Sequence, residues 1–179
     1  FIFNRKSPFA LSATAVLASM TLLGAHMSFM DPVIPNLVPV LKSSWVTLHV
    51  SVITGSYGFL GLGAILALIS LILMILSDES NRERISGTID ELTVITYRTL
   101  VLGLYLLTIG TFLGAVWANE SWGRYWGWDP KETWSLITWL LYAALLHQRL
   151  TVGWRGRKAA IMAIVGFLAV LFTFLGVNF

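Results

Sequence analysis

Residues 45–77 read WVTLHVSVITGSYGFLGLGAILALISLILMILS, an uninterrupted apolar run of 33 residues. A helix crosses the hydrocarbon layer of a membrane, about 30 Å thick, with about 20 such residues. At about 1.5 Å per residue, this run forms a helix of roughly 50 Å, which exceeds the layer. We therefore predict a membrane helix whose outer end projects above the lipid, with His49 in the external headgroup zone or higher.

The composition also indicates a membrane protein, because 56% of the residues are apolar and 12% are charged. A soluble globular domain has about twice that charged share. Apolar stretches long enough to cross a bilayer recur along the chain, so we predict an all-α, polytopic membrane helix bundle with about five transmembrane helices. The predicted spans are Pro8–Phe29, Trp45–Ser77, Arg98–Trp117, Pro130–Leu150 and Lys158–Phe179.

The basic residues predict which way the chain is oriented, because Lys and Arg collect in short loops on the cytoplasmic side. One side carries Arg5, Lys6, Arg82, Arg84, Arg98, Arg149, Arg155, Arg157 and Lys158, and the other carries Lys42, Arg124 and Lys131. We predict a cytoplasmic amino end and an external loop between the third and fourth spans. Between Asp78 and Tyr97, charges alternate with apolar residues at helical spacing, which predicts an amphipathic segment on the cytoplasmic face.

The chain contains no cysteine, which excludes disulfides, thiolate metal ligands and redox chemistry by its own thiols. Its apolar pattern continues to Phe179 without a helix cap, so we expect residues 1–179 to be an excerpt of a longer protein. The expected surroundings are membrane lipid, and no nucleic acid partner is expected.

Six of the eight tryptophans lie between Trp117 and Trp139, in the predicted external loop and the start of the next span. An aromatic belt at the membrane surface explains individual rings, but this density favours a platform for a flat aromatic ligand. Trp122, Trp126 and Trp128 offer broad faces and indole N–H donors, and Tyr125 adds a hydroxyl group.

The end of the tryptophan-rich loop carries a helix start signal. Asp129 is the predicted N-cap, Pro130 takes the first helical position, and Glu132 completes a capping box. Arg124 and Lys131 are external cations that either pair with carboxylates, such as haem propionates, or are solvated.

Two histidines are candidate metal ligands. His49 is either an axial ligand for haem iron or a histidine at a wet interface. His147 shares one helix face with Trp139 and Ala143, near the cytoplasmic end. It either faces the bundle interior or a water-filled path, as costly ionisable groups within a span do, or it snorkels to the cytoplasmic headgroups.

Residues 122–139, WGRYWGWDPKETWSLITW, resemble the tryptophan-rich WWD signature of the haem-handling membrane proteins of cytochrome c biogenesis. Residues 128–134, WDPKETW, are similar to the CcsA branch rather than to CcmC or CcmF. The resemblance extends from Trp45 to Phe179. It includes Leu48-His49-Val50 before a glycine-rich helix, Leu146-His147 before Gly153-Trp-Arg-Gly156, and Phe174-Leu-Gly-Val-Asn178.

This resemblance implies a System II cytochrome c synthase, with haem lyase activity, in which CcsA acts with a separate or fused CcsB (CcsBA). Such proteins convey haem b across the membrane and present it on the WWD loop, here residues 118–139. The haem vinyl groups then join the thiols of Cys-x-x-Cys-His in apocytochrome c, which a thiol-reducing protein keeps available. The implied location is the bacterial inner membrane, with the WWD loop facing the periplasm, rather than the thylakoid membrane.

By motif position, His49 matches the first external iron ligand and His147 matches an intramembrane haem ligand. The haem-binding set implied by the resemblance adds Trp122, Arg124, Tyr125, Trp126, Trp128 and Asp129. The second external histidine of the family follows the last helix, beyond Phe179, and the partner of His147 is expected elsewhere. Two other functions remain open: a quinone-binding respiratory subunit or small-molecule transporter, and a structural membrane scaffold. Haem in the purified protein distinguishes them.

Overall fold

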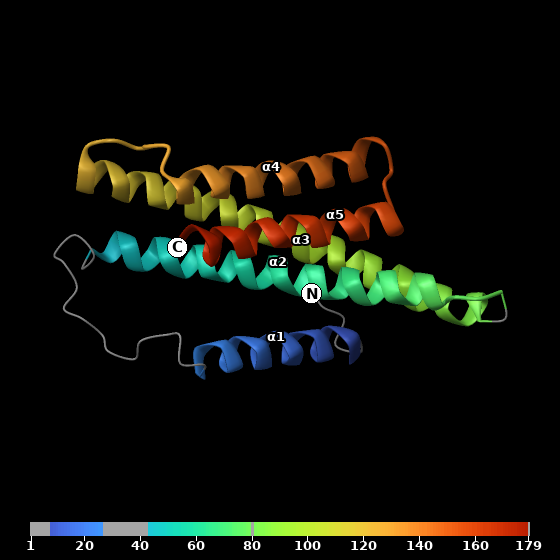
Figure 1. The fold of residues 1–179 in the computed structure, drawn as a ribbon. Helices are drawn as coiled ribbons and strands as arrows, with labels where there is room; N and C mark the ends of the chain where they lie inside the picture. Colours follow the sequence, from blue (N-terminus) through green and yellow to red (C-terminus); the bar gives the residue numbers. More distant parts are fainter. Residues whose placement is uncertain (1–7, 27–42, 80, 179) are drawn as a thin grey trace.

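The computed structural model describes residues 8–26, 43–79 and 81–178, and all regular structure within them is helical. The α-helices run lengthwise beside one another (Figure 1), which confirms the predicted helix bundle. In chain order they are α1 (Pro8–His26), α2 (Ser44–Leu76), α3 (Arg82–Trp122), α4 (Pro130–Thr151) and α5 (Arg157–Phe174), followed by the short 3-10 helix η2 (Gly176–Asn178). The last residues of the first predicted span, 27–29, lie outside the described residues.

Among the described helices, three are long and apolar enough to cross a membrane: α2, α3 from Glu83 onward, and α5. Helix α4 has 22 residues and so has the required length, but polar and aromatic side chains make it less apolar. It packs within the same bundle as the three candidate spans (Figure 1).

Close contact between α2 and α3 depends on glycine. A Cβ atom on Gly63 of α2 would lie 2.5 Å from the side chain of Leu100, and one on Gly103 of α3 would lie 2.6 Å from that of Leu60. Each leucine therefore fills the space that the opposing glycine leaves free. Small residues have this role in membrane helix pairs, where close van der Waals packing drives association.

Helices α4 and α5 complete the core. Tyr142 of α4 is fully buried and donates a hydrogen bond from its hydroxyl group to the backbone oxygen of Ala163, at 3.3 Å. A Cβ atom on Gly166 of α5 would lie 2.8 Å from the Tyr142 ring. The bulkiest side chain of the core thus lies against a glycine of the neighbouring helix.

The predicted amphipathic segment between Asp78 and Tyr97 is not a separate helix on the membrane surface. Helix α3 begins within this segment, at Arg82, and continues without a break to Trp122. It has 41 residues, roughly 60 Å at the standard rise. Leu92 and Ile95 are buried in a cluster with residues of α2. The helical spacing is confirmed from Arg82 onward, but part of the apolar stripe packs against α2, so the prediction of a separate segment on the membrane surface was wrong.

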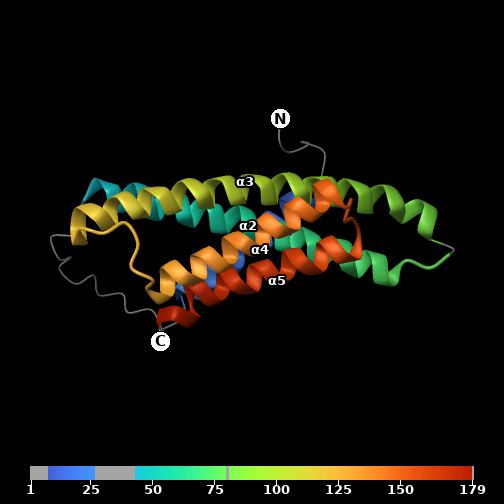
Figure 2. The ribbon, with the colours of Figure 1, turned by 90° about the horizontal axis from the view of Figure 1, so that it is seen from above.

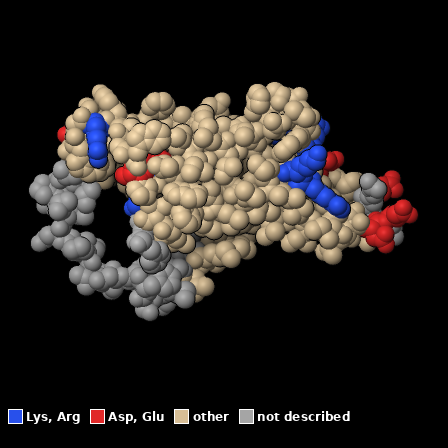
Figure 3. Space-filling view, turned by 45° about the horizontal axis from the view of Figure 1, so that its top comes forward, with Lys and Arg blue, Asp and Glu red and all other residues tan. Residues whose placement is uncertain are grey.

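Different elements meet at the two ends of the bundle (Figure 2). At the tryptophan end, α2 begins, α3 ends and α4 begins. At the opposite end, which we call the basic end, the α2–α3 hairpin extends beyond the α4–α5 loop (Figure 2). Lys and Arg side chains gather near that loop, and acidic side chains lie at the hairpin tip (Figure 3). The connection between α1 and α2 lies outside the described residues.

Candidate functional site

Helix α4 begins as the sequence predicts. The Asp129 carboxylate accepts a hydrogen bond from the Glu132 backbone N–H at 2.7 Å, and Glu132 Oε2 accepts one from the Asp129 N–H at 3.4 Å. These two bonds form the predicted capping box, with Pro130 in the first turn. Glu132 Oε2 also accepts a bond of 2.7 Å from the Gly127 N–H. Glu132 therefore holds the loop as well as the helix start, a role that we did not predict.

Trp128 has a backbone conformation that is rare for a bulky residue. Its φ of 58° lies in the left-handed region, where Cβ crowds the backbone. Such a residue costs about 1–3 kcal/mol and persists where its surroundings fix it. Here the backbone N–H groups on both sides of it, those of Gly127 and Asp129, donate to Glu132. Strain of this kind is concentrated at functional sites.

The loop presents large aromatic surfaces to its surroundings. Trp128 is 70% exposed, Tyr125 61% and Trp122 57%. The half-buried Trp126 supports Trp128 edge to face, with ring centroids 5.8 Å apart, and Trp117 supports Trp122 in the same manner at 4.6 Å. Three of the predicted platform residues are thus exposed, and the fourth holds one of them in place.

Arg124 lies across the loop rather than extending away from it. A Cβ atom on Gly127 would lie 2.9 Å from Arg124 Cζ, so the guanidinium packs directly over this glycine. Beside it is a hollow of about 430 Å³, lined by Ala118, Trp122, Arg124, Asp129 and Glu132. This hollow brings an indole ring, a guanidinium and two carboxylates together at the tryptophan end.

His49 does not extend into solvent but lies against α3. Its Nδ1 is 2.8 Å from the backbone oxygen of Gly110. A Cβ atom on Gly114 would lie 2.6 Å from His49 Cε1, so only glycine leaves room for the imidazole there. Gly110 and Gly114 of α3 therefore hold this histidine, one through its carbonyl oxygen and the other by leaving room for the ring.

The hydrogen bond to Gly110 determines the tautomer of His49. A carbonyl oxygen only accepts, so Nδ1 carries the proton and donates it. In the neutral imidazole, Nε2 then has a free lone pair, and no partner for Nε2 is found among the described residues. A backbone carbonyl that holds one ring nitrogen while the other binds metal is the usual arrangement of metal-ligating histidines.

The imidazole of His49 contacts α3 close to the tryptophan-rich loop. Gly114 lies eight residues before Trp122, which corresponds to about 12 Å along the helix axis. Within the described chain, no group of three or more His, Asp or Glu side chains could hold a metal ion.

His147 lies elsewhere, near the carboxyl end of α4, and its side chain is exposed. On the same helix face, Trp139 and Ala143 are half-buried. The described part of the bundle therefore leaves the imidazole on an outer surface. The structure does not bring His147 and His49 together.

Three side-chain hydrogen bonds that the sequence did not indicate tie α4 to its neighbours. The pairs are Tyr57 of α2 with Ser135, Thr108 of α3 with Trp139 Nε1 at 2.8 Å, and Thr173 of α5 with Thr138 at 3.4 Å. Each pair joins a different helix to the first half of α4. The helix that carries the loop residues Asp129 and Glu132 is thereby fixed relative to the helix that carries His49.

Comparison with known proteins agrees with this architecture. A family model described as "Cytochrome C assembly protein" matches residues 1–179. The chain is 53% identical to Protein NrfI of Wolinella succinogenes, covering 99% of this chain and 20% of that protein. It is 42% identical to a cytochrome c biogenesis protein CcsA of Prochlorococcus marinus, covering 99% of this chain and 66% of that protein.

A third relative is the cytochrome c biogenesis protein CcsA of Chlamydomonas reinhardtii, which is 51% identical over 79% of this chain and 40% of that protein. The chain thus spans between one fifth and two thirds of the length of these relatives. The family model covers every residue from the first helix to the last. The chain belongs to the cytochrome c assembly protein family, and within it to the CcsA group of multi-pass membrane proteins of cytochrome c biogenesis.

Proposed function

We propose that this chain binds haem at its tryptophan end and presents it for attachment to apocytochrome c. The observation that carries the proposal is the bond from His49 Nδ1 to the Gly110 carbonyl, which leaves Nε2 free as an axial ligand. Membership in a cytochrome c assembly family supplies the substrate class. Haem b is the expected form, because its vinyl groups are the carbons that accept thiols.

The residues of the loop would contact the macrocycle and its propionates. Trp122, Tyr125 and Trp128 provide exposed surfaces against which a macrocycle packs. Arg124, together with the hollow beside it, supplies a cation for a propionate carboxylate. Holding the macrocycle in this way leaves its vinyl edge open to an approaching Cys-x-x-Cys-His segment. A thiol then adds across a vinyl double bond, the sulfur joining one carbon and the proton joining the other.

The chain has no side chain that acts as a nucleophile in this scheme, and its contribution is placement of the reacting carbons and axial ligation. The thiols belong to apocytochrome c and are kept reduced by a further protein. CcsB, separate or fused, is the expected partner that completes the synthase. We place the tryptophan end on the periplasmic side of a bacterial inner membrane.

His147 is proposed as the ligand of a second haem site within the membrane. Its exposed side chain supports a shared site, in which the other ligand comes from CcsB or another part of the longer protein. Haem would reach this site first and the tryptophan end afterwards, which gives the chain a role in haem transport.

The test compares His49→Ala with His147→Ala in the full-length protein, purified in detergent. We expect His49→Ala to shift the Soret band of haem bound at the tryptophan end, and added imidazole to restore it. His147→Ala is compared with it because it removes the same side chain from the other proposed haem site. When haem is added directly to the solubilised protein, His147→Ala should leave the Soret band of haem at the tryptophan end unchanged. A Soret band that His49→Ala leaves unchanged would rule out ligation by His49, and haem-free material from both the parent protein and the variants would favour a quinone-binding or transport function.

A further inference from the structure

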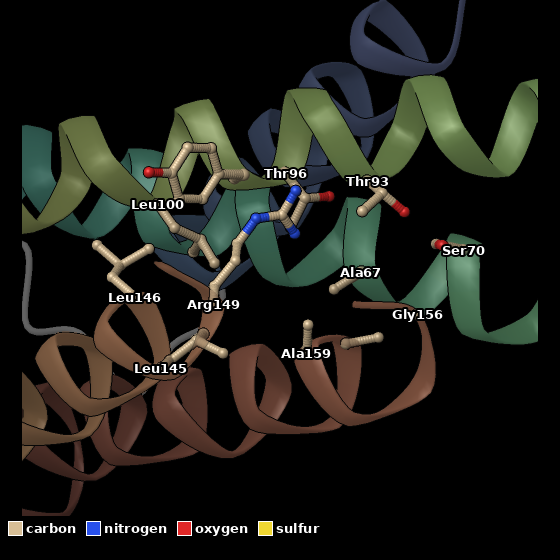
Figure 4. Close-up of a pocket in the computed structure, with 12 residues that line it drawn as sticks. Ala67, Ser70, Thr93, Thr96, Leu100, Leu145, Leu146, Arg149, Gly156 and Ala159 are labelled. Atoms are coloured by element: carbon tan, nitrogen blue, oxygen red, sulfur yellow. The ribbon is translucent and has the colours of Figure 1, made fainter. Parts of the chain in front are cut away.

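The basic end of the bundle contains a small cavity between α2, α3, α4 and α5 (Figure 4). Its volume is about 20 Å³, enough for about one water-sized atom. Most of its lining is apolar or small, but Ser70, Thr96 and Arg149 also line it. The Arg149 side chain reaches from α4 toward Thr96 on α3 (Figure 4).

Two hydroxyl groups of this cavity are unsatisfied. Ser70 is only 2% exposed, and neither its Oγ nor Thr96 Oγ1 has a hydrogen-bond partner among the described residues. Other hydroxyls of α3 bond to the carbonyl four residues earlier, as Thr99 and Thr108 do at 2.7 and 2.8 Å. Buried polar groups are nearly always paired, so two unpaired donors beside one cavity indicate an acceptor from outside the described residues.

The guanidinium of Arg149 also has N–H groups that can donate to a ligand. Its side chain is half-buried, and its Cζ lies 4.5 Å from the centroid of the Tyr97 ring. A cation–π contact involves no hydrogen-bond acceptor, so it leaves the guanidinium N–H groups free to donate. Within the described chain, the ionisable groups that act on Arg149 are Arg155 and Tyr97, and neither is a carboxylate. The charge therefore lacks the anion that half-buried arginines usually pair with.

We propose that this cavity is an oxyanion site for a phosphate or carboxylate group carried by a molecule at the membrane surface. Arg149 would supply the positive charge, and the hydroxyls of Ser70 and Thr96 would donate to one oxygen. The volume fits this assignment, since a single oxygen enters the cavity while the rest of the group stays at the guanidinium. A water molecule would satisfy the hydroxyls but would not neutralise Arg149.

Two sources share this chemistry: the headgroup of an anionic lipid and a propionate of haem. The inference does not depend on the proposed haem site, because the lipid source remains if haem does not bind. The site differs from the tryptophan end in every residue and lies at the opposite end of the bundle.

The experiment measures binding by the full-length protein in nanodiscs. Inorganic phosphate is followed by equilibrium dialysis, and retained phosphatidylglycerol in phosphatidylcholine discs by native mass spectrometry. Haem is compared with haem dimethyl ester, which lacks the carboxylates, by absorption titration. We expect Arg149→Gln to weaken binding about tenfold, because a charge-assisted bond is lost, and Ser70→Ala and Thr96→Val about threefold each.

Arg84→Gln is the matched control, because it removes the same charge from an exposed arginine that neither lines the cavity nor acts on Arg149. We expect it to change binding less than about twofold. If Arg149→Gln weakens retention of phosphatidylglycerol, the source is the lipid headgroup. If it weakens binding of haem but not of haem dimethyl ester, the source is the propionate. If Arg149→Gln fails to fold, Arg149→Lys keeps the charge without the planar fork and should weaken binding about threefold. Equal affinities for the Arg149 and Arg84 variants in all three binding measurements would overturn the proposal. Normal binding by both hydroxyl variants would also overturn it.

Discussion

Replacing Gly114 by Ala should displace the proposed iron ligand, the imidazole of His49, without changing the His49 side chain itself. The new Cβ would lie 2.6 Å from His49 Cε1 and 2.8 Å from Nδ1, whereas ordinary van der Waals contact begins at 3.4 Å. Either the imidazole or the helix must therefore move by close to 1 Å, roughly the difference between these distances. The bond from Nδ1 to the Gly110 carbonyl, 2.8 Å long, does not survive such a shift.

The expected loss follows from the role of that bond. Removing the group that orients a metal-ligating histidine weakens metal affinity about 10- to 100-fold. The packing overlap alone costs about 1–3 kcal/mol of stability. We therefore expect Gly114→Ala to bind haem about 10- to 100-fold more weakly than the parent protein, with added imidazole restoring the Soret band.

Gly55→Ala is the matched control, because nothing lies within 4 Å of a Cβ atom built there. Alanine is favoured over glycine within a helix by about 1 kcal/mol, so this variant should be as stable as the parent or more so. The assay is absorption titration with haem, together with thermal unfolding to exclude global loss of structure. If Gly114→Ala bound haem as tightly as Gly55→Ala does, the space that Gly114 leaves for the imidazole would have no part in ligation.

Further predictions concern the loop and the core. Glu132→Ala removes the acceptor for the Gly127 and Asp129 N–H groups, so amide hydrogen exchange in residues 127–129 should accelerate about tenfold or more, and Glu132→Gln, which keeps one acceptor oxygen, should do so less. Gly166→Ala would force a Cβ to within 2.8 Å of the buried Tyr142 ring and should cost about 1–3 kcal/mol in unfolding experiments, whereas unchanged stability would show that α4 and α5 separate easily. Trp128→Gly should raise stability by about 1 kcal/mol, because glycine adopts a φ of 58° freely, while haem affinity falls. Trp128→Ala, which keeps the strain, should lower affinity without that gain.

The parts of the fold that follow from local chemistry could be predicted. The Asp129 cap and the position of Glu132 depend on residues three apart, and the structure forms the capping box that they predict. Helix α2 ends at Leu76, one residue before the predicted limit, because the apolar run ends there. The prediction that the chain handles haem came from the family resemblance rather than from the spacing of residues.

Features that join distant residues could not be predicted. His49 and Gly110 are 61 residues apart, and only packing of α2 on α3 brings them together. The pair Gly110 and Gly114 was a usable signal, but it indicated close helix approach and not which side chain fills the space. The positive φ of Trp128 could not be predicted either, because tryptophan rarely adopts it. The hydrogen bond from the Gly127 N–H to Glu132, which helps to fix this conformation, extends beyond the capping box.

The glycines of the α2–α3 contact show how one residue type serves two purposes. At Gly63 and Gly103 the free space is filled by leucine side chains, so these glycines contribute to stability by close packing. At Gly114 the space is filled by an imidazole, whose donor Nδ1 lies within bonding distance of a carbonyl. Substitution by alanine should therefore separate the two roles. Gly103→Ala should lower the unfolding temperature and leave haem affinity of the folded fraction unchanged, whereas Gly114→Ala should lower that affinity even where the protein remains folded.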